Sequence, residues 1–170
     1  MAAEKCDIRT CPQCHKGKER LVLVVDKLIM KHSDYERILA HAQGGLPNEM
    51  CGLLAGTVDP ATETALATGT VEHVYLLTNL DASNEHFTMD PKEQLAAVKD
   101  ARSHGWDMLG NWHSHPETPA RPSVEDKKLA YDPSTCYLIL SLEDAEHPAL
   151  NAYHIARDGF ATRVRLKIEG

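Results

Sequence analysis

The stretch Gly110–Asp126, GNWHSHPETPARPSVED, is the part of this 170-residue chain around which the rest is organised. His113 and His115 are separated by one residue, so in an extended strand both imidazoles project from the same face. The prolines that follow force the backbone out of the strand, and Ser123 and Asp126 have the spacing of a helix N-cap and its first turn. Two imidazoles from a strand end and one carboxylate from a helix start can therefore converge on one point.

These three side chains predict a metal centre. Two nitrogen ligands and one oxygen ligand, with a fourth position left open, describe a catalytic zinc site, whereas structural zinc sites are usually closed and rich in sulfur. Each half of the motif also has a structural explanation, because His-x-His can lie on an edge strand and Ser-x-x-Asp is a common helix cap. The order of the two halves, and the constrained loop that joins them, favour the metal site.

Together with Glu49, upstream in PNEMCGLLAG, this pattern resembles the JAMM (MPN+) metalloprotease family over most of the chain. The resemblance implies that His113, His115 and Asp126 bind one catalytic Zn2+ ion. It also implies a general acid/base at Glu49 and, at Ser123, a hydroxyl that helps to stabilise the tetrahedral intermediate. The reaction expected from such a site is hydrolysis of an amide or isopeptide bond.

Within that family, the compact chain and the motif HSHPETPARPS resemble the bacterial free-standing branch that acts on sulfur-carrier and ubiquitin-like proteins. This resemblance implies cleavage after the Gly-Gly terminus of the carrier, which releases cysteine or tail residues. The branch associated with DNA repair has Asn between its two histidines, where this chain has Ser114. Two alternatives stay open: an MPN scaffold that binds a ubiquitin-like partner without turnover, and a zinc amidohydrolase of a small molecule. The complete ligand set favours an enzyme over a scaffold.

The composition limits the classes of function. The chain is 42% hydrophobic, enough for a sizeable core, and its net charge of -7 and pI of about 5.8 argue against binding to nucleic acid. No apolar run approaches the ~18 residues of a membrane span, and the N-terminal MAAEKCDIRT lacks the apolar core of a signal peptide. We therefore expect a cytoplasmic protein without a membrane partner. The oligomeric state stays open, with a homodimer among the options.

The N-terminal segment differs in composition from the rest of the chain. Cys11-Pro-Gln-Cys14 has the spacing of half a zinc site, and Cys6 or His15 can complete a second zinc site there. A reduced polar tail explains the same residues equally well. An odd number of cysteines, five in all, and no secretion signal favour free thiols or metal ligands over disulfides.

Hydrophobic periodicity predicts alternating strands and helices and, with them, an α+β fold. The sheet is expected to be mixed, mostly antiparallel and curved, and to be sandwiched by helices; the resemblance implies a barrel-like sheet with layering like that of cytidine deaminases. We expect an N-terminal extension over residues 1–20 and a single metalloprotease domain over 21–170. Strands are predicted at 21–25, 49–56, 66–80, 106–112, 136–142, 150–157 and 160–168, and helices at 31–43, 91–104 and 123–130.

Local signals define two of the element ends. Asp90, followed by Pro91 and Glu93, predicts a helix N-terminus with a capping box. Asp158-Gly159 predicts the turn of the last hairpin.

Two further residues near the motif are candidates for function. Cys51 shares a strand face with Glu49, so a nucleophilic cysteine is a rival interpretation. Such chemistry needs a paired histidine, and the best-placed histidines belong to the metal motif, so we interpret Cys51 as a packing residue. The polar loop 79–90 carries Phe87, and the resemblance places this region beside the substrate groove. Phe87 is therefore a candidate substrate contact, with packing under its own loop as the alternative.

Overall fold

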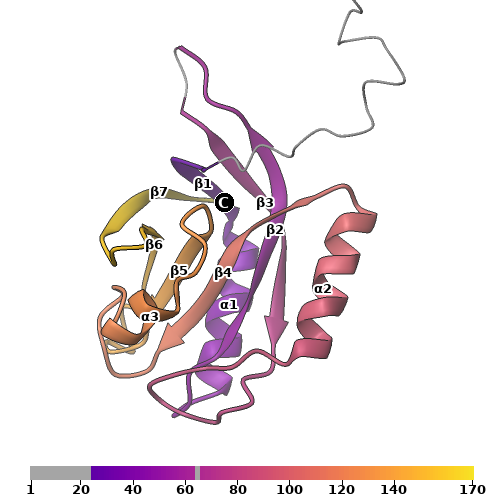
Figure 1. Ribbon diagram of the computed structural model, residues 1–170. Coiled ribbons are helices and arrows are strands. Elements are labelled where there is room, and N and C mark those ends of the chain that lie inside the picture. Colours follow the sequence, from indigo (N-terminus) through magenta and orange to yellow (C-terminus); the bar gives the residue numbers. More distant parts are fainter. Residues whose placement is uncertain (1–23, 64–65) are drawn as a thin grey trace, which may run out of the picture.

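The computed structural model describes residues 24–63 and 66–170 (Figure 1). The first strand, β1, spans Lys27–Lys31, and its alternate residues Leu28 and Met30 are fully buried. Of the strand expected at 21–25, the structure describes Val24 and Val25, and both precede β1. For these two residues the prediction is wrong. Strand propensity favoured the valine-rich run, but the segment that alternates between core and surface is the one that pairs.

The remaining elements lie within a few residues of the predicted ranges. Helix α2 begins after Asp90, whose side chain accepts the N–H groups of Lys92 and Glu93, and ends before Gly105, which has a positive φ of 74°. Along the chain after β1 come α1 (His32–Gly44), β2 (Cys51–Asp59), β3 (Thr68–Leu77), α2 (Pro91–Ser103), β4 (Asp107–His115), α3 (Val124–Leu129), β5 (Cys136–Ser141), β6 (Ala149–Ile155) and β7 (Ala161–Glu169).

One detail of α2 differs from the prediction. The carboxylate of Glu93 accepts hydrogen bonds from the N–H and hydroxyl of Thr78, at 2.7 and 3.0 Å. It does not return to the N-cap, so the expected capping box is wrong. The residue that closes such a box locally is used here for a tertiary contact between α2 and the end of β3.

The strands form a closed barrel in the order β1-β3-β2-β4-β5-β6-β7. The pairs β1–β3, β1–β7 and β4–β5 are parallel, and the other four pairs are antiparallel. The mixed, mostly antiparallel pattern is therefore confirmed. The curved sheet of the prediction closes because β1 pairs with β3 on one side and with β7, from the far end of the chain, on the other.

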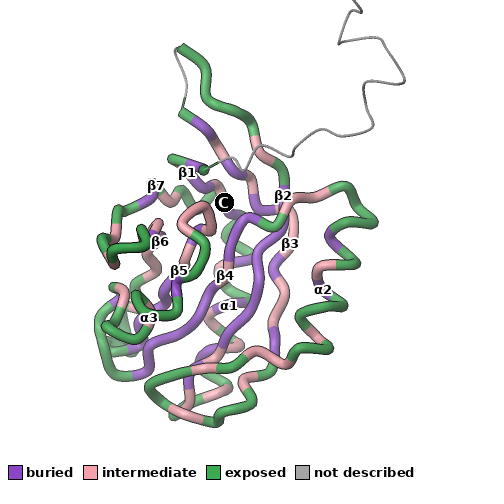
Figure 2. Tube along the Cα trace, viewed as in Figure 1, coloured by how far each residue is buried: buried purple, intermediate pink, exposed green. Residues whose placement is uncertain are grey.

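Helices α1 and α2 cover opposite faces of the strands β2 and β3. Ile38 and Ala42 of α1 join the main core cluster, which also contains Leu54 and Trp112. Ala97 of α2 belongs instead to a smaller cluster, with Leu53 and Leu77 on the outward face. The most buried tube in Figure 2 follows β2, β4 and β5, while α2 and the loops are largely exposed. The central strands are thus rigid supports for whatever projects from their ends.

Two sequence-based expectations concern the remaining segments. The described residues contain no helix that is both long and apolar enough to cross a membrane. The alternatives of a second zinc site or a reduced tail at Cys6, Cys11, Cys14 and His15 concern residues 1–20, which lie outside the described residues.

Candidate metal centre

Strand β4 ends in the two histidines of the motif. β4 lies between β2 and β5, and both imidazoles are buried, with His113 2% and His115 3% exposed. Their Nε2 atoms are 3.0 Å apart. The predicted projection of both rings from one strand face is therefore confirmed, and the paired strands on either side fix the direction of the two rings.

The third candidate ligand comes from the start of α3. One carboxylate oxygen of Asp126 lies 3.3 Å from His113 Nε2 and the other 3.5 Å from His115 Nε2. Ser123 accepts the N–H of Asp126 on its hydroxyl oxygen at 3.0 Å and donates its own N–H to the Asp126 carboxylate at 2.7 Å. This capping box, predicted only in outline by Ser-x-x-Asp, holds the carboxylate toward the imidazoles. One ligand atom from each of the three residues lies within 4.8 Å of the others.

The loop after β4 orients His115. Its Nδ1 atom lies 3.1 Å from the carbonyl oxygen of Pro119 and 3.0 Å from the Thr118 hydroxyl. The Thr118 carbonyl is held in turn by the Ser141 hydroxyl at 2.7 Å. An Nδ1–H that donates to Pro119 leaves the lone pair of Nε2 facing the site, as in most metal-binding histidines.

His113 is oriented differently. Its Nδ1 atom is buried and has no hydrogen-bond partner among the described residues. Its ring instead stacks on that of Phe87, with centroids 4.8 Å apart and planes 28° from parallel. Phe87, a candidate substrate contact on sequence grounds, therefore packs against a predicted metal ligand.

Glu49 lies just before β2 and beside the ligand cluster. It is only 4% exposed, and its Oε1 is 4.0 Å from His115 Nε2. Burial raises the pKa of Glu49 to about 8, although the nearby His115 opposes the rise. A carboxyl group with a pKa near neutrality can both accept and release a proton under ordinary conditions.

The protonation states of Asp126 and His113 suit a metal ion, whereas at His115 the effect of burial is outweighed by Asp126 and Glu49, which raise its pKa. Burial alone would raise the pKa of Asp126, but the adjacent imidazoles of His113 and His115 hold this pKa well below its usual range. Burial lowers the pKa of His113, against the opposing effect of Asp126. A carboxylate and neutral imidazole are the forms in which these groups bind metals. Two imidazole nitrogens and one carboxylate oxygen form a donor set that fits a divalent transition-metal ion.

Cys51 lies in β2 directly opposite His113 of β4. Its side chain is fully buried, and burial raises the pKa of its thiol to about 12. At neutral pH the thiol is therefore protonated and not nucleophilic. The structure favours the packing interpretation over the cysteine nucleophile.

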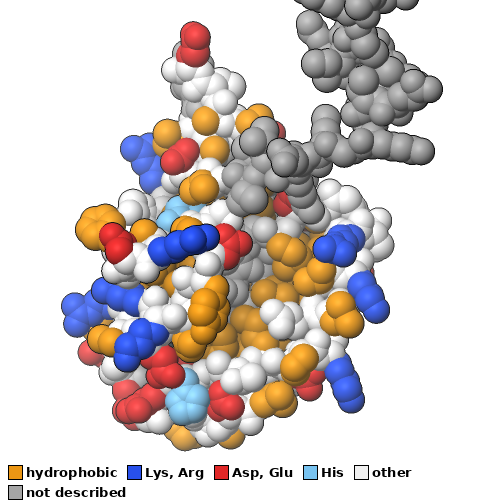
Figure 3. All heavy atoms as spheres, viewed as in Figure 1, with side chains coloured by type: hydrophobic (Ala, Val, Ile, Leu, Met, Phe, Trp, Pro, Cys, Tyr) orange, Lys and Arg blue, Asp and Glu red, His pale blue; other side chains and the backbone are white. Residues whose placement is uncertain are grey.

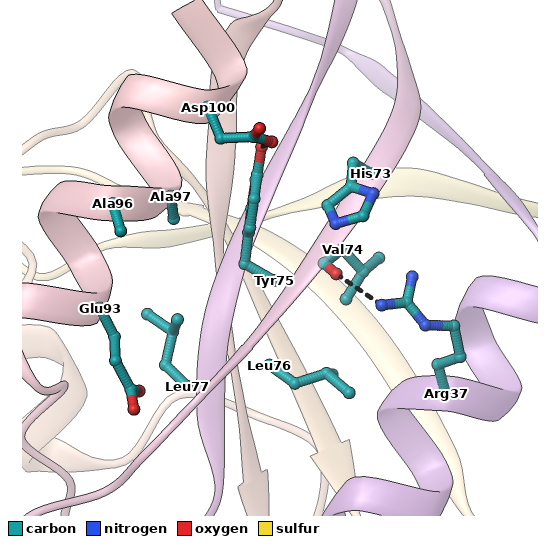
Figure 4. A pocket seen from close by; sticks show the side chains of 10 residues that line it. All are labelled: Arg37, His73, Val74, Tyr75, Leu76, Leu77, Glu93, Ala96, Ala97 and Asp100. Atoms are coloured by element: carbon teal, nitrogen blue, oxygen red, sulfur yellow. Dashed lines mark hydrogen bonds between the residues drawn. The ribbon is translucent and has the colours of Figure 1, made fainter.

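A separate groove of about 420 Å³ lies over β3, between α1 and α2 (Figure 4). Its polar side chains are engaged with one another and with the backbone. Arg37 donates to the carbonyl of Val74 at 3.1 Å, and the Tyr75 hydroxyl donates to Asp100 at 2.7 Å. The residues that line the groove do not include His113, His115 or Asp126. The two hydrogen bonds hold its polar side chains in contacts between the helices and β3.

Sequence reasoning missed several residues that support the site. Thr118 contacts His115 within one loop, and Ser141 and Asn79 make tertiary hydrogen bonds to the carbonyls of Thr118 and Glu49. For Asn79, the sequence shows only a residue that favours turns directly after an apolar strand. This pattern does not identify the Glu49 carbonyl as its hydrogen-bond partner.

Comparison with known proteins identifies the family. Residues 31–156 match the family model described as prokaryotic homologs of the JAB domain. The chain belongs to this family. The matched range includes Glu49, both histidines and the Ser123–Asp126 turn, so the JAMM/MPN+ resemblance inferred from these residues is confirmed.

Individual relatives agree with the family match. Desampylase of Haloferax volcanii is 35% identical over 111 residues, which cover 62% of this chain and 74% of that protein. CysO-cysteine peptidase of Mycobacterium tuberculosis is 30% identical over 135 residues, covering 79% and 86% respectively. A Desulfitobacterium hafniense protein known from a solution structure is 52% identical, covers 84% of this chain with 94% of its own, and superposes with a TM-score of 0.71. This JAB-family chain therefore has relatives named as enzymes and a structural neighbour of high identity.

Proposed function

We propose that this JAB-family chain is a zinc metallopeptidase that hydrolyses the amide or isopeptide bond after the Gly-Gly terminus of a ubiquitin-like or sulfur-carrier protein. The observation that carries the proposal is the convergence of His113, His115 and Asp126 with the Glu49 carboxyl 4.0 Å from His115. Relatives named CysO-cysteine peptidase and probable TtuB-protein conjugate cleaving protease support a peptidase that acts on protein conjugates.

Zinc, when bound by these three residues, supplies Lewis acidity that polarises the substrate carbonyl and acidifies water to a pKa of about 7. Glu49 takes the proton of the attacking water at its carboxylate and returns it to the leaving amine. The Ser123 hydroxyl accepts the N–H of Asp126, which leaves its own proton free to donate to the developing oxyanion.

The shape of the molecule supports a chain-like substrate. Figure 3 shows hydrophobic side chains gathered over β2 and β4, between α2 and the lobe that carries α3. An open apolar surface suits an extended peptide tail, whereas a small amide needs a closed pocket. The tail of a carrier protein is therefore preferred to a small-molecule amide as the substrate.

The complete set of site residues argues against a scaffold without turnover. A domain that only binds a partner has no use for two buried imidazoles facing a carboxylate, since burying polar groups costs free energy. The two functions make different predictions for one pair of assays, metal content and cleavage.

The test uses the full chain and a carrier fusion in which Gly-Gly is joined by an amide bond to cysteine, with an Ala-Ala fusion as the control. Elemental mass spectrometry of the wild type is expected to give one zinc that is lost in His113→Ala/His115→Ala and retained in Cys11→Ser/Cys14→Ser. The zinc-loaded wild type is expected to cleave only the Gly-Gly fusion. Binding of the fusion without cleavage would instead support the scaffold, and zinc that follows the cysteines would move the metal to the N-terminal segment.

A further inference from the structure

Glu49 is held through its main chain by the loop that joins β3 to α2. Its N–H donates to the carbonyl of Ser83 at 2.7 Å, and its carbonyl accepts from the side-chain amide of Asn79 at 2.9 Å. Both partners belong to the loop 79–89. The segment before β2 is thus fixed on two sides by residues that lie 30 and 34 positions later in the chain.

The side chain of Asn79 connects this contact to the rest of the loop. Its Nδ2 donates to the carbonyls of Glu49 and His86, and its Oδ1 accepts the N–H groups of Asp81 and Thr88, both at 3.0 Å. The hydrogen-bonding capacity of one amide is therefore used in full. The Nδ2 group thus links Glu49 to His86 of the loop, while the Oδ1 atom joins two main-chain N–H groups within the loop.

The base of the loop is attached to α2. Glu93 binds both the N–H and the hydroxyl of Thr78, and the N–H of Asp90 donates to the Thr78 carbonyl at 3.1 Å. Asn79 and Met89 form an isolated β-bridge directly above this anchor. A helix start, a strand end and one asparagine thus form a continuous connection to Glu49.

Pairing with β4 reaches Met50, whose N–H donates to the Ser114 hydroxyl and whose carbonyl accepts the Ser114 N–H, at 2.8 and 2.9 Å. The N–H and carbonyl of Glu49 itself are bonded instead by Ser83 and Asn79 of the loop. We propose that Asn79 is a positioning residue, whose amide sets the place of the Glu49 carboxyl beside the two histidines. The inference rests on the proposed function, because it assumes that Glu49 carries the proton during hydrolysis. Without the donor group of Asn79, the Glu49 carboxyl is expected to move, while His113, His115 and Asp126 stay in place to bind the metal.

The test replaces only the donor. Asn79→Asp keeps the size of the side chain and an oxygen that can accept from Asp81 and Thr88, but places a carboxylate oxygen against the Glu49 carbonyl. Asn84→Asp makes the same chemical change and adds the same charge at an exposed position of the same loop. With the Gly-Gly fusion, kcat of Asn79→Asp is expected to fall by about 10- to 100-fold, the scale of a misplaced catalytic group. Its KM and its zinc content should match those of Asn84→Asp.

A second measurement does not depend on cleavage. Hydrogen exchange of the Glu49 amide, slow in the wild type because it donates to Ser83, is expected to accelerate in Asn79→Asp and not in Asn84→Asp, while amides of β4 and β5 stay protected. A wild-type kcat in Asn79→Asp, a loss confined to KM or zinc, or unchanged exchange at Glu49 would overturn the inference. A zinc-loaded wild type that cleaves nothing would reject the proposed function instead, and the exchange data would still decide whether Asn79 holds Glu49.

Discussion

Phe87 and His113 form an aromatic stack through which the loop 79–89 contacts the candidate metal-binding residues directly. The imidazole nitrogen of His113 that points away from the site has no hydrogen-bond partner among the described residues. Metal-binding histidines are usually oriented by a hydrogen bond at that nitrogen. At His113 the contact found in place of that hydrogen bond is the stack on the phenyl ring of Phe87.

Replacing Phe87 should therefore weaken metal binding. Phe87→Leu fills much of the same volume but offers no flat face, and we expect the zinc affinity to fall by about 10-fold, the lower end of effects of groups that orient a metal ligand. Phe87→Tyr keeps the ring and is the matched control. Competition with a chromogenic chelator measures both affinities. Equal zinc affinity in the two variants, with a raised KM in Phe87→Leu, would assign Phe87 to substrate contact.

Ser123→Ala should affect stability and turnover separately. Loss of the N-cap of α3 is expected to lower the free energy of unfolding by about 1 kcal/mol. Loss of an oxyanion donor is expected to reduce kcat by about 10²- to 10³-fold, with zinc content unchanged. Ser123→Thr retains the hydroxyl and should preserve both properties. A kcat that falls only as far as the stability loss predicts would leave Ser123 as a helix cap alone.

The candidate metal site could be predicted from the sequence because each half of its motif is a short-range pattern. Alternation along a strand places His113 and His115 on one face, and a helix cap places Ser123 beside Asp126; both patterns span a few residues. The position of Glu49 beside them, at 4.0 Å from His115, agrees with an expectation that came from family resemblance. Spacing alone does not bring a residue sixty positions upstream into the site.

The parts that could not be predicted depend on long-range pairing. The closure of the barrel requires Leu28 of β1 to lie beside Leu166 of β7, a register that no local pattern encodes. The same limit explains the missed role of Asn79, whose partner Glu49 is distant in the chain, and the wrong capping box at Glu93, whose carboxylate turns to Thr78.

Glu49→Gln should retain zinc and lose turnover, and it also carries a pH signature in the metal-free protein. Burial raises the pKa of Glu49 from 4.5 to about 8, so the folded state holds this proton more tightly than the unfolded state. The resulting stabilisation is present below pH 4.5 and is lost as the pH rises through about 8. Glutamine does not titrate, so the stability of wild type relative to Glu49→Gln should fall across this range, by at most about 1.4 kcal/mol per pH unit. Urea unfolding after chelation measures the difference, and a constant difference with pH would contradict the buried carboxyl.

The buried thiols should be inert in the folded protein. Burial raises the pKa values of Cys51 and Cys136 to about 12, so neither is a thiolate near pH 8. Peptide-resolved mass spectrometry after brief iodoacetamide treatment is expected to find both unmodified in the native protein and modified in urea. Cys51→Ala should retain turnover on the Gly-Gly fusion. Rapid native alkylation of Cys51, or loss of kcat with zinc intact in Cys51→Ala, would revive the cysteine nucleophile.

The capping box of α3 has a consequence for how members of this family diverge. Ser123 and Asp126 satisfy backbone groups of a helix start, so selection for folding alone is enough to preserve them. His113 and His115 occupy buried strand positions that an apolar side chain would fill at lower cost once chemistry is no longer selected. In relatives that have lost hydrolytic activity, we expect the two histidines to be substituted first and Ser-x-x-Asp to be retained as a helix cap. The presence of both histidines is therefore a better marker of catalytic activity than the presence of Ser-x-x-Asp.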